Sequence, residues 1–126
     1  MTDYPRPPGK TTIAPDVLLT IVRMTALNVD GVSQLSTVPG GVNRLFRRGY
    51  GDGVRIEIED DTVYTDLYVI LKNDTNIRQV SRSLQKKVSR AISEMVGMRV
   101  GRINIHIEDI DYPEHNSPEA VNQTKN

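Results

Sequence analysis

Residues 54–72, VRIEIEDDTVYTDLYVILK, decide the fold. The first six alternate apolar and charged side chains, which is the period of two expected of a half-buried strand. Asp60 and Asp61 follow, and residues of this type favour a chain reversal because their short side chains bond to nearby backbone. Apolar side chains recur over residues 63–71 as a second, longer strand. The stretch therefore predicts a β-hairpin with one apolar and one polar face.

A long helix and a last strand follow the hairpin. The polar residues 73–76 offer helix N-caps, and Gly97 is a natural residue to follow a helix end. The apolar side chains between these two signals fall on one helical stripe: Ile77, Val80, Leu84, Val88, Ala91, Ile92 and Met95. Alternating isoleucines then predict a strand over residues 100–110, with Ile103, Ile105 and Ile107 on one side.

The segment before the hairpin predicts a second helix. It begins with Pro15 at its first position and ends before Asp30 and Gly31, as expected of the residues that start and stop helices. We expect short strands at residues 10–13 and 32–38. Residues 42–50 lie between glycines and are expected to form a loop or short helix.

These elements predict an α+β domain. Because each strand has one apolar face, both main helices should cover the same face of a mostly antiparallel or mixed sheet, giving a two-layer sandwich. The domain is expected over residues 10–112, with flexible segments at 1–9 and 113–126, where apolar residues are few.

The composition of the chain excludes several classes of function. Sixteen basic and sixteen acidic residues give a formal net charge of zero, so no global field attracts the chain to nucleic acid or an anionic membrane. Cysteine is absent, which excludes disulfides and thiol chemistry. Neither a signal peptide nor a run of about 18 apolar residues occurs, so we expect neither standard export nor a membrane span.

No pattern of catalytic residues is present. The two histidines are His106, on the last predicted strand, and His115, in the tail, and no hydrolase or metalloprotease motif accompanies them. Acidic residues cluster near Glu59 and near Glu108, but their spacing matches no metal-binding loop. We therefore expect no catalysis, no cofactor and no metal.

Two basic features are candidate anion or lipid contacts. On the long helix, Arg78, Arg82, Lys86 and Arg90 recur every four residues and form one row opposite the apolar stripe. The predicted loop over residues 42–50 carries Arg44, Phe46, Arg47 and Arg48 and no acid.

The first helix is apolar nearly all round, which indicates a covered outer face. Its expected core stripe is Val17, Leu18, Ile21, Val22 and Thr25. Leu27 falls on the opposite, solvent side, and Leu19 and Met24 border it. We therefore predict a partner or oligomer interface at Leu19, Arg23, Met24 and Leu27.

The polar face of the sheet would show Tyr64, Tyr68 and Ile70. Exposed aromatics on a sheet can stack on RNA bases, but nearby carboxylates such as Glu57 and Asp66 would repel phosphate. Nucleic acid is therefore the less favoured partner.

The chain resembles the alkaline shock protein family of bacterial envelope-stress and general-stress proteins. The resemblance covers about residues 9–112 and lies in the order and spacing of the segments at residues 9–17, 29–32, 53–58, 66–70, 76–77, 97–100 and 103–107. It implies a cytosolic, non-enzymatic protein held near the inner face of the membrane by a separate membrane-anchored partner.

Two functional hypotheses follow. The first is a non-enzymatic stress-response scaffold that forms homo-oligomers and docks on that partner. The second is a nucleic-acid-binding regulator that uses the basic row and the arginine-rich loop. Salt dependence separates them, because phosphate binding weakens steeply with salt.

Overall fold

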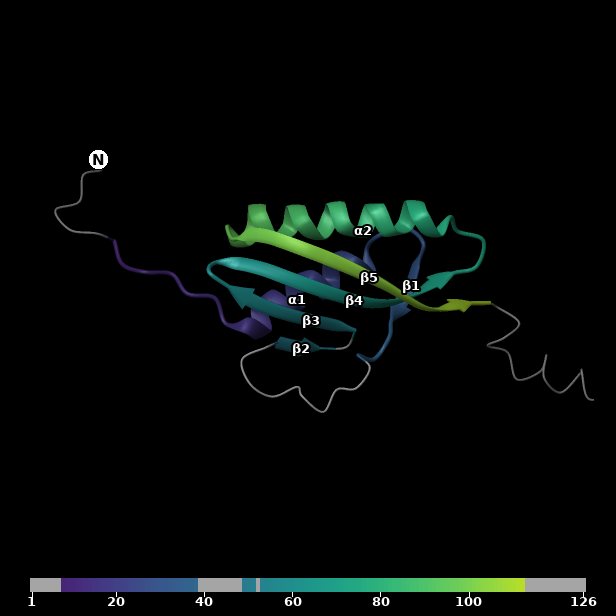
Figure 1. Cartoon of the computed structure of the whole chain (residues 1–126), viewed down its shortest axis with the longest axis horizontal. Helices are drawn as coiled ribbons and strands as arrows, with labels where there is room; N and C mark the ends of the chain where they lie inside the picture. Colours follow the sequence, from purple (N-terminus) through teal and green to yellow (C-terminus); the bar gives the residue numbers. More distant parts are fainter. Residues whose placement is uncertain (1–7, 39–48, 52, 113–126) are drawn as a thin grey trace, which may run out of the picture.

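The computed structural model describes residues 8–38, 49–51 and 53–112 (Figure 1). Their elements follow in the order α1 (Pro15–Leu27), β1 (Val32–Leu35), β2 (Gly49–Gly51), β3 (Val54–Glu59), β4 (Thr62–Lys72), α2 (Ile77–Ala91), the π-helical turn η2 (Ile92–Val96) and β5 (Arg99–Asp111).

Strand β4 is the centre of a mixed sheet. Its first half pairs antiparallel with β3 and its second half pairs antiparallel with β1, so these strands share one edge of β4. Tyr68 marks the junction, because its N–H donates to the carbonyl of Gly53 and its carbonyl accepts from the N–H of Ser36. Strand β5 runs parallel to β4 along the other edge, and β2 pairs with the outer edge of β3. The predicted hairpin and the mixed sheet are confirmed.

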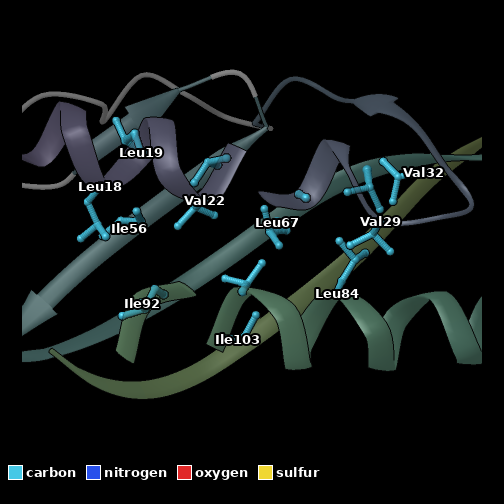
Figure 2. Packing of buried hydrophobic residues seen from close by; sticks show 14 of the residues in the cluster. Leu18, Leu19, Val22, Val29, Val32, Ile56, Leu67, Leu84, Ile92 and Ile103 are labelled. Atoms are coloured by element: carbon cyan, nitrogen blue, oxygen red, sulfur yellow. The ribbon is translucent and has the colours of Figure 1, made fainter. Parts of the chain in front are cut away.

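Both helices contribute to one core against the sheet. Figure 2 shows Leu18 and Val22 of α1 in the same cluster as Leu84 of α2 and Leu67 of β4, and all four are buried. Alternate residues of β3 and β4 face this cluster because successive side chains of a strand point to opposite faces. The predicted α+β sandwich is confirmed.

The predicted long helix begins and ends where its local signals indicate, but its last part is the π-helical turn η2 and not a continuation of α2. The side chain of Asn76 accepts a hydrogen bond from the N–H of Gln79 at 3.0 Å, and Gly97 ends η2 with a left-handed φ of 77°. The ends of the predicted apolar stripe, Ile77 and Met95, are nevertheless exposed. Its buried members are Val80, Leu84, Val88 and Ile92.

Three predictions for the N-terminal half need correction. Residues 10–13 form no strand. The strand expected at 32–38 ends at Leu35. Residues 49–51 pair with β3 and form β2, although glycines had predicted a loop there. The rest of the predicted loop, at 42–48, lies outside the described residues, as do the ends at 1–7 and 113–126.

Candidate interaction surfaces

Helix α1 has a buried face and an exposed apolar face. Its buried residues are Leu18, Leu19, Val22 and Ala26. The prediction that Leu19 borders the solvent face is wrong: it is 7% exposed and belongs to the core. The prediction that Val17 belongs to the core is also wrong, since it is 49% exposed.

The error is a rotation of α1 by about one residue step, which is ~100° around a helix. A helix that is apolar nearly all round has no unique buried face in its own sequence. The contacts of α1 with the sheet and with α2 select the face that carries Ala26, a small residue absent from the predicted stripe.

Apolar residues remain on the outer face of α1. Met24 is 56% exposed and Leu27 is 45% exposed, as the sequence predicted. Val17 extends this face toward the start of the helix, and Ile13 lies just before it. Arg23, the remaining predicted interface residue, is half-buried.

The basic row on α2 is exposed, as predicted. Arg78, Arg82, Lys86 and Arg90 all lie at the surface. Arg90 is paired with Glu94, whose carboxylate lies 3.5 Å from the guanidinium, but both side chains are mostly exposed and such pairs contribute little to stability. Among the described ion pairs, the other three residues of the row have no acidic partner.

The second predicted basic feature, formed by Arg44, Phe46, Arg47 and Arg48, lies outside the described residues.

The uncovered face of the sheet carries a polar cluster around Asp66. One carboxylate oxygen, Oδ1, accepts from the Asn104 amide at 3.1 Å and lies 3.0 Å from His106 Nε2. The other oxygen is 3.8 Å from the Arg55 guanidinium. The sequence could not have shown this cluster, because it depends on the register between β4 and β5, whose paired residues here are 38 and 40 positions apart.

The tyrosines of this face already contact neighbouring side chains. Tyr68 is only 8% exposed, and its ring stacks on His106 with centroids 4.4 Å apart and planes 10° apart. Tyr64 has the Arg102 guanidinium over its ring at 5.6 Å. A hollow of about 230 Å³ lies beside it, lined by Glu57, Glu59, Tyr64, Thr65, Asp66, Arg102 and Asn104. Its carboxylates make this hollow unfavourable for phosphate.

Two features are absent from the described part of the chain. Nowhere in it do three His, Asp or Glu side chains come close enough together to hold a metal ion. None of its helices has the length and apolar character needed to cross a membrane.

Comparison with known proteins identifies the family. Residues 4–112 match the model of the alkaline shock protein 23 family, which is described as having a cell envelope-related function. The chain belongs to the alkaline shock protein 23 family. The resemblance seen in the sequence is therefore confirmed, and its coarse functional context is the cell envelope.

Relatives in this family include three bacterial proteins described as uncharacterized. YqhY of Bacillus subtilis (strain 168) is 31% identical over 106 residues, covering 82% of this chain and 78% of the relative. Spy1535 of Streptococcus pyogenes serotype M6 is 31% identical over 103 residues, covering 81% and 79%. YloU of Bacillus subtilis (strain 168) is 22% identical over 106 residues, covering 81% and 88%.

Solved structures show only distant similarity. A variant of MamM CTD has 13% identity and a TM-score of 0.47, with 75% of this chain and 95% of that chain covered. Similarity at this level carries no argument about function.

Proposed function

We propose that this chain is a non-enzymatic scaffold of the bacterial cell envelope stress response, which self-associates and docks on a membrane-anchored protein at the cytosolic side of the membrane. The family supports the envelope context. The observation that carries the scaffold proposal is the exposed apolar face of α1, formed by Val17, Met24 and Leu27. Apolar patches on a protein surface commonly mark contacts with other proteins.

The position of the basic row supports a membrane-proximal role. Arg78, Arg82 and Lys86 lie at the surface of α2, a different element from the one that carries the apolar face. Basic residues are attracted to anionic lipid headgroups by about 1 kcal/mol each near the surface. The row would therefore supply weak lipid attraction from a different helix than the one that carries the apolar docking face.

The surroundings of His106 support the non-enzymatic part of the proposal. Its Nε2 hydrogen-bonds to Asp66, and its ring is stacked on Tyr68. A hydrolase would need a nucleophile beside this histidine, and the hydrogen bond that Nε2 makes is to a carboxylate. These contacts hold the imidazole as part of the sheet surface.

The nucleic-acid alternative has less support. Tyr68 is stacked within the protein, and Tyr64 lies beside Glu57 and Glu59. Single-stranded nucleic acid binds to accessible aromatic faces next to unpaired basic side chains. On this sheet face Arg102 lies over the Tyr64 ring, Arg55 lies beside Asp66, and the neighbouring carboxylates repel phosphate.

Co-sedimentation tests the proposal. The full chain would be mixed with native membranes from the source cell, with the same membranes after protease treatment, and with protein-free vesicles containing anionic lipid. We expect recovery with untreated membranes at about 150 mM salt, and strong loss after protease treatment, because the main docking site is a protein.

Other outcomes contradict the proposal. Equal binding to protein-free vesicles would mean that lipid alone, and not a protein partner, binds the chain. Failure to bind native membranes would overturn the docking model. Preferential binding to single-stranded nucleic acid, weakening steeply between 50 and 200 mM salt, would favour the alternative.

A further inference from the structure

The outer face of α1 forms a continuous stripe. Val17, Thr20, Met24 and Leu27 are all exposed and follow one another at intervals of three or four residues. With about 100° per residue, these positions fall within ~80° of one another around the helix, opposite the buried face. The buried and the exposed stripes are therefore separate surfaces of one helix.

The polar groups of this stripe are already satisfied within α1. The Thr20 hydroxyl donates to the carbonyl of Asp16 at 2.9 Å. At the C-terminal end, the Asn28 amide donates to the carbonyl of Met24 at 3.0 Å. Covering the stripe would leave these hydrogen bonds intact. Burial would therefore leave few polar groups without a hydrogen-bond partner, and the desolvation cost would be small.

Two opposite charges border the same side of the stripe. Asp16 and Arg23 are seven residues apart, which places them within ~20° of each other around the helix and about 10 Å apart along it. Among the described ion pairs, neither side chain has a partner. The other border of the stripe carries Ile21 and Asn28, neither of which is charged.

We propose that the stripe is covered by α1 of a second copy of this chain, with the two helices antiparallel across a two-fold axis that passes near Thr20. This inference rests on the proposed self-association and specifies its geometry. Around such an axis Val17 faces Met24 of the second copy, and the small Thr20 lies at the point of closest approach.

The charges favour this arrangement. A two-fold axis perpendicular to both helices keeps each border on the same side, so Asp16 of one copy lies beside Arg23 of the other, and the pair occurs twice. Parallel helices would instead place this charged border against Ile21 and Asn28 of the second copy. Complementary charges at an interface rim set orientation, and here they select the antiparallel pair.

Charge reversal tests the pairing. Asp16→Arg alone and Arg23→Asp alone each place like charges together in a homodimer, and we expect the dissociation constant to rise about tenfold or more. Mixing these two variants places opposite charges together at both contacts, so a heterodimer should form with affinity close to wild type. The double variant Asp16→Arg/Arg23→Asp should also regain self-association. Sedimentation velocity over a concentration series measures all of these states.

Matched controls keep the test specific. Arg78→Asp makes the same charge change on α2 and should leave self-association unchanged. Met24→Glu should abolish it, because the charge enters the centre of the stripe. Circular dichroism must show the same helix content in every variant, since Asp16 also lies in the first turn of α1.

The outcomes separate this inference from the proposed function. Two results would overturn the antiparallel pair while leaving self-association intact. In the first, neither single charge reversal weakens association. In the second, association is restored neither in the mixture nor in the double variant. A wild-type chain that is monomeric throughout would overturn self-association itself. Membrane docking is decided separately by co-sedimentation.

Discussion

Leu19 and Val17 are close in the chain, but their side chains have opposite environments. Leu19 is 7% exposed within the core, and Val17 is 49% exposed on the outer stripe. We predict that Leu19→Ala lowers the free energy of unfolding by about 2–5 kcal/mol, because it removes buried methyl groups and leaves a cavity. Val17→Ala should change it by no more than about 0.5 kcal/mol.

Urea unfolding followed by circular dichroism measures both changes. It should be done at protein concentrations low enough to keep the chain monomeric, since self-association would add stability. Similar losses for the two variants would mean that α1 is rotated relative to the arrangement described.

His106 provides a test of the proposed lack of catalysis. Its imidazole is hydrogen-bonded to Asp66, an arrangement that in other proteins can serve acid–base chemistry. We expect wild type and His106→Ala to be equally inactive in a broad hydrolase and transferase screen. Turnover by wild type that disappears in His106→Ala, with the fold retained, would contradict the proposal.

At the scale of elements, the junction of β1, β3 and β4 depends on Gly53. This residue has a φ of 73°, and an added Cβ would lie 2.6 Å from the Ser36 carbonyl oxygen and 2.8 Å from that of Tyr68. Because both atoms belong to backbone, they cannot move without disturbing the strands. We predict that Gly53→Ala lowers the free energy of unfolding by more than about 2 kcal/mol.

Gly97 is the matched control for this prediction. It has a similar φ of 77°, but no atom lies within 4 Å of an added Cβ. Gly97→Ala should therefore cost only the left-handed strain of about 1–2 kcal/mol. Thermal unfolding of both variants measures the difference, and an equal loss would show that crowding at Gly53 is relieved by movement of the strands.

At the scale of the whole molecule the formal net charge is zero, but basic side chains are concentrated on the exposed face of α2. We predict that Arg82→Ser/Lys86→Ser weakens flotation with anionic vesicles at low salt and has no effect at about 0.5 M salt, where the attraction is screened. Lys72→Ser/Arg99→Ser removes two exposed cations from β4 and β5 and should alter flotation less. Equal effects of the two double variants would remove the row as a specific lipid contact.

The parts of the fold that could be predicted carry their own local signals. The hairpin follows from alternation on both sides of Asp60 and Asp61, and these two residues adopt the positive φ angles of the turn. Helix α2 follows from Asn76, Gly97 and one apolar stripe. In these elements the side chains that decide the structure are neighbours in the chain, so a single sequence is sufficient.

The sequence by itself determined the α+β class, the hairpin, the start of α2, the end of the helical segment at Gly97 and the exposed position of the basic row. Only the tertiary structure decided which face of α1 is buried, because that helix has apolar residues on both faces and the sheet and α2 select one. Only the tertiary structure brought Asp66 beside His106, 40 residues away in the chain. That contact depends on the parallel pairing of β4 with β5, two strands that are separated in the chain by α2 and η2 and are not joined by a short turn.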